Sequence, residues 1–132
     1  MDSNVVVVDR INVPKALSVP EGLKYIRSTL LDVLREYNVA KAGIRLAEHT
    51  LHGPLVERIQ IEGVVQEALA SSMVKAYFAG QIATISAKAG IARTDFKEIV
   101  SGDKHFPEVE NWASHTAEER EAILTAIGAR NA

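Results

Sequence analysis

The chain has 132 residues, of which 47% are hydrophobic and 5% aromatic, and its formal net charge is −2. These values are typical of one folded domain with a core of aliphatic side chains. The absence of cysteine excludes disulfides and thiolate-bound zinc, and no apolar run reaches the roughly 20 residues of a membrane helix. The slight acidity argues against holding nucleic acid by charge alone, so a nucleic-acid partner would need a local basic patch.

The opening residues Met1–Asn4 are polar, and they lack the basic-then-apolar pattern of a secretory signal peptide. Together with the lack of cysteine, this pattern predicts a cytoplasmic protein that does not enter a membrane. We expect one domain over residues 1–132, with a helical C-terminal extension from about residue 91.

The first part of the chain predicts a strand, a helix and a second strand. Asn4–Val13 is rich in β-branched side chains and includes consecutive valines, which is typical of a strand. Ser18-Val19-Pro20-Glu21 has the Ser-x-x-Glu spacing of a capping box, and apolar residues follow it at helical spacing up to Tyr37. A helix is therefore expected up to Asn38, followed by a strand over Ala40–Ala47.

The middle of the chain repeats this alternation. The stretch from Leu55 to about Ser72 predicts a helix. Gly63 inside it costs about 1 kcal/mol of helix propensity, which suggests close packing against a sheet. Met73–Phe78 predicts a third strand, and Gln81–Ala89 a short helix that ends at Gly90. Strands that alternate with helices predict an α/β fold, with a small mixed or parallel sheet and flanking helices.

The C-terminal part predicts helices only. Thr94 is a candidate cap for a short helix through Val100, and Trp112 is expected to anchor the last helix in the core. Thr116-Ala117-Glu118-Glu119 has the spacing of a second capping box. The buried face of the helix that follows is expected to hold Ala122, Ile123, Ala126 and Ile127.

Candidate metal ligands follow the second predicted strand, in the segment Glu48–His52. In open α/β sheets, ligands bind outside the carboxyl ends of the strands. The carboxylate of Glu48 suits Mg²⁺ or Mn²⁺, whereas His49 and His52 would suit a transition metal such as zinc or iron. Polar residues also gather in loops because loops are solvated, so a site and a plain loop both stay open. Arg45, inside the strand, must be paired or reach the surface.

The order of elements resembles the ribonuclease H-like superfamily, especially its Holliday-junction-resolvase-like (RuvC-like) branch. The resemblance covers roughly Arg10 to Gly90 and depends on three segments, Ala42–Glu48, Ile59–Gln66 and Lys75–Phe78. It implies a ribonuclease H-like fold and a metal-dependent nuclease, in which two Mg²⁺ or Mn²⁺ ions generate a hydroxide and stabilise the leaving oxygen.

The resemblance also implies site residues. Glu48 matches the acidic residue that ends the family's fourth strand, and Glu118 and Glu119 are the nearest candidates for its late-helix acids. Both of these glutamates are equally typical of a first helical turn, where the helix dipole favours acids. The family's indispensable aspartate lies on a first strand for which this chain has no counterpart, because Asp9 is followed directly by a helix.

Two further hypotheses follow. The chain could be a catalytically degenerate member that acts as a binding or assembly module. Without a neighbouring hairpin, the strand at Val5–Val13 would be an exposed edge, and such edges are normally covered or paired. This predicts a homodimer, or another homo-oligomer, formed through the exposed sheet edge. The second is a small enzyme that holds a transition metal on Glu48, His49 and His52.

Overall fold

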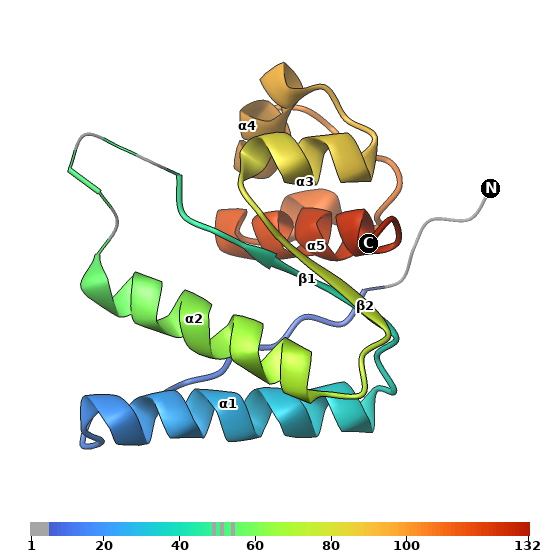
Figure 1. Ribbon diagram of the computed structural model, residues 1–132. Coiled ribbons are helices and arrows are strands. Elements are labelled where there is room, and N and C mark those ends of the chain that lie inside the picture. The colour runs from blue at the N-terminus through green and yellow to red at the C-terminus, as the bar shows by residue number, and fades with distance from the viewer. Residues whose placement is uncertain (1–5, 49, 51, 54) are drawn as a thin grey trace.

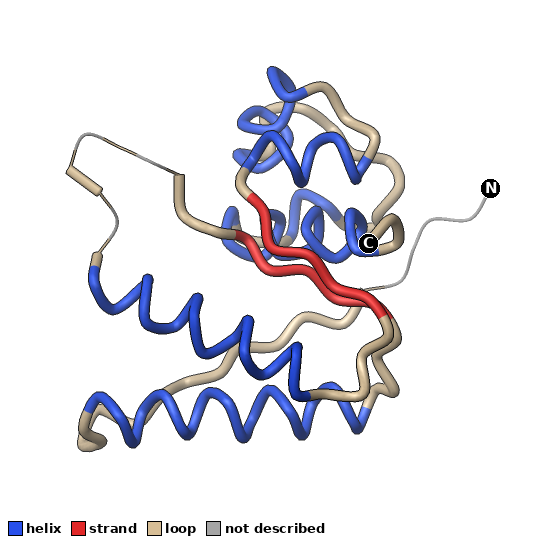
Figure 2. Tube along the Cα trace, in the orientation of Figure 1, coloured by secondary structure: helices blue, strands red, loops and turns tan. Residues whose placement is uncertain are grey.

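Two short parallel strands carry helices on both sides in the computed structural model, which describes residues 6–48, 50, 52–53 and 55–132 (Figure 1). The chain has an α/β fold, as predicted (Figure 2). Its elements, in chain order, are α1 (Val19–Glu36), β1 (Lys41–Arg45), α2 (Val56–Ser71), β2 (Ala76–Gly80), α3 (Ile82–Ala89), α4 (Arg93–Ser101), the 3-10 helix η1 (Trp112–Ser114) and α5 (Ala117–Ala129).

The sheet is a single parallel pair, with α2 as the crossover between its strands. Lys41 of β1 lies opposite Ala76 of β2, and Arg45 lies opposite Gly80. Parallel strands need such a crossover because the chain must return to the same end of the sheet. The strands predicted over Ala40–Ala47 and Met73–Phe78 are confirmed, although β2 begins and ends later than predicted.

The helices form two layers. Figure 1 shows α1 and α2 on one side of the sheet and α3, α4 and α5 on the other. The main hydrophobic cluster lies on the α3–α5 side and consists of Phe78, Ile85, Phe96, Ile99, Phe106, Val109, Trp112, Ile123, Leu124, Ile127 and Ala129. In the described part of the chain, no helix combines the length and the apolarity that crossing a membrane requires.

Trp112 anchors the C-terminal helices, as predicted. Its indole is 2% exposed, and its ring centroid lies 5.0 Å from that of Phe106. The buried Nε1–H donates to the carbonyl oxygen of Ile99 at 2.9 Å, so the polar end of the ring is satisfied.

Both predicted capping boxes are confirmed. The N–H of Ser18 donates to Glu21 Oε1 at 2.9 Å, and the N–H of Glu21 donates to Ser18 Oγ at 3.4 Å. At α5, the N–H of Thr116 donates to Glu119 Oε1 at 2.9 Å, and the N–H of Glu119 donates to Thr116 Oγ1 at 3.2 Å. Each box satisfies two N–H groups that a helix start would otherwise leave unpaired.

The strand predicted at the N-terminus is wrong for its described part, residues 6–13, which form no strand. Val6 and Val8 pack against the hydrophobic cluster, whereas Val7 is 74% exposed. The residues alternate as in a strand but have no ladder partner in this part of the structure. Because β-propensity reflects packing against neighbouring strands, valines alone do not make a sheet. The described sheet therefore has two strands.

Three local predictions are also wrong, the third of them in part. Gly63 is exposed, and a Cβ added there would meet nothing within 4 Å, so this glycine does not mark close packing against the sheet. The helix expected to start at Thr94 begins at Arg93, and its N-cap, Ala92, provides no side-chain hydrogen bond. On α5, Ile123 and Ile127 are buried as predicted, but the expected buried face is wrong for two small residues, Ala122 and Ala126, which are exposed.

Candidate functional site

Glu48 follows β1 at the carboxyl end of the strand, where the sequence predicted it. Its Oε1 accepts a hydrogen bond from the N–H of Ile82, the first residue of α3, at 2.6 Å. The same oxygen lies 3.7 Å from Nη1 of Arg45. A carboxylate at a helix N-terminus satisfies an unpaired N–H and meets the positive end of the helix dipole. Both contacts of Glu48 therefore hold the fold together.

Arg45 lies between two carboxylates, so of the two alternatives expected for its charge, pairing or reaching the surface, the structure shows pairing. Its Nε lies 3.4 Å from Glu121 Oε1, and its Nη1 faces Glu48 and donates to the carbonyl oxygen of Leu46. The side chain is only 15% exposed, and Nε makes no hydrogen bond within the described residues. A guanidinium of the chain itself thus provides the positive charge shared by Glu48 and Glu121.

Glu119 is a structural acid at the start of α5. Its Oε1 accepts from Thr116 and lies 3.5 Å from His115 Nδ1, while its Oε2 lies 3.8 Å from Arg10 Nη2. The backbone hydrogen bond from Thr116, with smaller contributions from Arg10 and His115, lowers the pKa of Glu119 below its ordinary value. This agrees with the interpretation of Glu119 as a first-turn acid.

Glu118 is exposed on the same turn, and among the described residues neither Glu118 nor Glu119 forms a cluster of three or more acidic or histidine side chains with Glu48. The acidic residue that α5 brings close to the Glu48 loop is Glu121, which the sequence analysis missed. In the sequence, the one sign of its role is that Glu121 is an acidic residue, three positions after Glu118, on a helix with a mostly apolar face.

The histidines of the predicted metal site are only partly described. His49 lies outside the described residues, and His52 is exposed. Across residues 6–48, 50, 52–53 and 55–132, no three His, Asp or Glu side chains come together as a metal site. The assignments of Mg²⁺ or Mn²⁺ to Glu48, and of a transition metal to Glu48, His49 and His52, stay predictions.

One edge of β1 is open. The N–H of Leu46 donates to the carbonyl oxygen of Gly80 at 2.9 Å, so the even-numbered residues of β1 bond to β2. In a parallel ladder, alternate residues point their N–H and C=O groups to opposite edges. The backbone groups of Lys41, Gly43 and Arg45 therefore face away from β2. Those of Lys41 and Gly43 have no hydrogen-bond partner in the described structure.

Two side chains of α2 cover the far end of this open edge. Arg58 Nη2 donates to the carbonyl oxygen of Arg45 at 3.3 Å, and Glu62 Oε2 accepts from the N–H of Ala47 at 3.0 Å. The two side chains also pair with each other, with 2.9 Å between Arg58 Nε and Glu62 Oε2. The i,i+4 spacing of Arg58 and Glu62 predicts an ion pair on the helix, but sequence alone does not show that the pair reaches β1.

A groove of about 470 Å³, here called the edge groove, runs beside the open edge between α2 and α5. Its walls combine apolar side chains with charges of both signs. The lining residues are Gly43, Ile44, Arg45, Arg58, Ile61, Glu62, Val65, Glu118, Glu121, Ala122 and Thr125.

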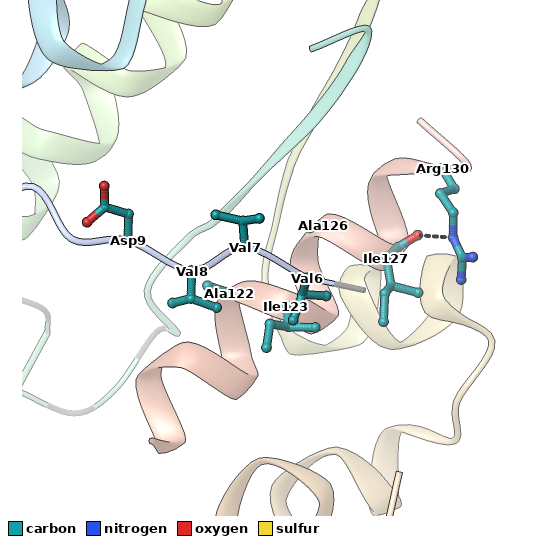
Figure 3. A pocket seen from close by; sticks show the side chains of 9 residues that line it. All are labelled: Val6, Val7, Val8, Asp9, Ala122, Ile123, Ala126, Ile127 and Arg130. Atoms are coloured by element: carbon teal, nitrogen blue, oxygen red, sulfur yellow. Dashed lines mark hydrogen bonds between the residues drawn. The ribbon is translucent and has the colours of Figure 1, made fainter. Parts of the chain in front are cut away.

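A second groove, of about 380 Å³, lies between α5 and the N-terminal segment Val6–Asp9 (Figure 3). Figure 3 shows the side chain of Val7 pointing away from those of Val6 and Val8. Ala122 lines both grooves, so the N-terminal segment and the open edge of β1 border neighbouring parts of α5.

Compared with known proteins, the sequence matches no protein-family model and no curated protein sequence.

Proposed function

We propose that this chain is a non-catalytic assembly module in which a second copy docks along the open edge of β1. The observation that carries the proposal is the row of unpaired backbone groups at Lys41 and Gly43 on the open edge of β1, which reaches the edge groove at Gly43. Exposed strand edges readily pair with a further strand, and backbone hydrogen bonds then provide much of the affinity.

The incoming strand would be the N-terminal segment of the second copy. A strand docked in the edge groove would lie between α2 and α5, and strands covered on both faces are almost continuously apolar. The described residues Val6–Val8 are such a run: they have no ladder partner, and Val7 is 74% exposed. Val6 and Val8 pack against the hydrophobic cluster of their own copy, and docking would exchange that contact for the groove of the second copy. Because each copy has one such segment and one open edge, the contact would be reciprocal about a two-fold axis.

Charge complementarity also favours this occupant. The valines are followed by Asp9 and Arg10, one charge of each sign. The edge groove likewise carries a cation from α2, Arg58, and an anion from α5, Glu118. A strand with both charges can therefore find a partner on each wall of the groove.

The resemblance to the ribonuclease H-like scaffold is part of this proposal. The resemblance depends on the order strand, helix, strand, helix, strand, helix; α1, β1, α2, β2 and α3 match its last five elements, whereas the described residues 6–13 form no first strand. A docked strand would widen the two-stranded sheet towards the four to six strands that sheets usually have. The loss of catalysis is supported by Glu48, whose carboxylate is engaged by Ile82 and Arg45.

Measuring the molar mass over a wide concentration range tests the proposal. We expect the wild-type chain to dimerise, and Val7→Lys to weaken the dimer about tenfold or more, because a charge would enter a strand covered on both faces. Lys41→Pro should weaken it similarly, because proline removes an N–H that points to the open edge and bonds nothing in the monomer.

Lys41→Ala is the matched control, since it also loses the bond from Lys41 Nζ to the carbonyl oxygen of Arg130 but keeps the backbone N–H. A chain that stays monomeric throughout, or a dimer that ignores both Val7→Lys and Lys41→Pro, would overturn the proposal.

A metal-dependent nuclease is the second candidate, because Glu48 and Glu121 converge on Arg45 at the carboxyl end of β1. Its test is cleavage of branched, single-stranded and hybrid nucleic acids with Mg²⁺ or Mn²⁺. Cleavage that Glu48→Gln abolishes would establish a nuclease in place of the non-catalytic module. Zinc or iron that is retained through purification and lost in His49→Ala would instead support the transition-metal enzyme.

A further inference from the structure

We infer that the Arg58–Glu62 pair of α2 is a latch that competes with the docking strand for the end of the β1 edge. This inference rests on the proposed function. It adds that the two side chains limit how much of the β1 edge the docking strand can pair with. The term latch refers to these two side chains while they are bonded to Arg45 and Ala47.

The latch occupies the positions that a neighbouring strand would need. A strand docked along the whole edge would bond to the outward-facing residues Lys41, Gly43 and Arg45 and then to the N–H of Ala47. The carbonyl oxygen of Arg45 already accepts from Arg58 at 3.3 Å, and the N–H of Ala47 already donates to Glu62 at 3.0 Å. With the latch closed, an incoming strand can therefore pair with Lys41, Gly43 and the N–H of Arg45, but not with the carbonyl oxygen of Arg45 or the N–H of Ala47.

The two side chains stand in for a strand in chemical terms as well. Arg58 provides a donor where a strand would place an N–H, and Glu62 provides an acceptor where it would place a C=O. Their mutual ion pair, 2.9 Å long, holds them in this arrangement. Side chains that satisfy an exposed edge are one way in which proteins prevent unspecific strand pairing.

Differences in exposure indicate how the latch would open. The side chain of Arg58 is 46% exposed, whereas that of Glu62 is 15% exposed. Arg58 can therefore swing into solvent and regain hydration, and ion pairs this exposed are weak. A strand that fits the whole edge would replace both latch bonds with ladder bonds, but a short or misaligned strand would not reach them.

Glu62→Met in the full chain tests the latch through two readouts. The variant removes the acceptor of Ala47, so the Ala47 amide should exchange with solvent faster under conditions where the chain is monomeric. It should also tighten the dimer, because the N–H of Ala47 is freed for the docking strand while Arg58 is kept. We expect the dimer dissociation constant to fall about tenfold, equivalent to about 1.4 kcal/mol.

Glu57→Met is the matched control, since it makes the same charge change at an exposed site of the same helix. Glu62→Gln keeps an oxygen for Ala47 and should keep its exchange slow, which separates loss of the bond from loss of folding.

The possible outcomes distinguish failure of the latch from failure of the assembly. Unchanged Ala47 exchange in Glu62→Met, or faster exchange with an unchanged or weaker dimer, overturns the latch but leaves the assembly intact. If the wild-type chain and Glu62→Met both stay monomeric, the assembly is overturned, and the latch with it.

Discussion

Glu48 caps α3: its Oε1 accepts the N–H of Ile82 at 2.6 Å, so a loop that follows β1 completes the helix that follows β2. The N-cap residue of α3, Gln81, makes no side-chain cap of its own. Its amide nitrogen instead donates to the carbonyl oxygen of Ala47 at 2.8 Å, which ties the same two segments together. Glu48 thus has a structural role that is independent of any chemistry.

The first prediction concerns this cap. Glu48→Ala should lower the free energy of unfolding by about 1 kcal/mol, the usual effect of removing a helix cap. Glu48→Gln should cost less, because the amide keeps an oxygen that can accept from Ile82. Urea denaturation measures both, with the exposed Glu110→Ala as control. A Glu48→Ala variant as stable as the wild type would show that the cap contributes nothing.

The second prediction concerns Arg120, which is only 9% exposed. Its Nε, Nη1 and Nη2 donate to the carbonyl oxygens of Trp112, Val100 and Ala113 at 3.1, 3.1 and 3.0 Å. Arg120→Met would leave these carbonyl groups without a donor, so we expect a loss of about 3 kcal/mol. Thermal or urea unfolding tests this value against Arg93→Met on the exposed start of α4. Equal stabilities of the two variants would contradict it.

The third prediction compares two glycines. A Cβ at Gly43 would lie 2.9 Å from Cζ of Phe78, so Gly43→Ala should destabilise the fold by about 1–3 kcal/mol through overpacking. A Cβ at Gly63 would meet nothing within 4 Å, so Gly63→Ala should stabilise α2 by about 0.5–1 kcal/mol. Parallel urea titrations of both variants would reveal this difference in sign, and a destabilised Gly63→Ala would refute the account of Gly63.

The fourth prediction concerns acid pH. The pKa of Glu119 is lowered chiefly by the backbone hydrogen bond from Thr116, and that of Glu67 chiefly by its side-chain hydrogen bond with Arg27. A lowered folded-state pKa means that the unfolded chain takes up the proton first as the pH falls. The stabilisation is therefore complete above the ordinary pKa of 4.5 and is lost as the pH falls through the folded-state value.

We expect the urea midpoint to decrease from pH 6 to pH 3, and to decrease less in Glu119→Gln. The drop measured for the wild type provides the control. An identical drop in Glu119→Gln would exclude a contribution from this residue.

The elements that sequence predicted correctly are those whose causes are local. In the capping boxes, Ser18 and Thr116 each form hydrogen bonds with the residue three positions later, and the structure has both boxes. The position of Glu48 at the end of β1 also follows from the strand that precedes it. The valines before Asp9 show the opposite case, because a strand needs a partner that β-branched residues cannot provide for themselves.

The parts that sequence did not predict depend on distant segments. Arg120 falls in the apolar stripe with Ile123, Leu124 and Ile127, and that placement was a signal of burial. Its acceptors, however, lie at Val100, Trp112 and Ala113, and only the folded chain brings them together. The same holds for Arg58 and Glu62, whose i,i+4 spacing is visible in the sequence although their contact with β1 is not.

Trp112 is the only tryptophan of the chain, and it lies in the hydrophobic cluster on the α3–α5 side of the sheet. Intrinsic fluorescence will therefore follow the melting of that layer and will be nearly blind to α1 and α2. Tyr25, inside α1, and Tyr37, its C-cap, are each at least 39% exposed and would change little on unfolding. If the two layers separate before the C-terminal layer melts, far-ultraviolet circular dichroism will record an earlier transition than the tryptophan signal does.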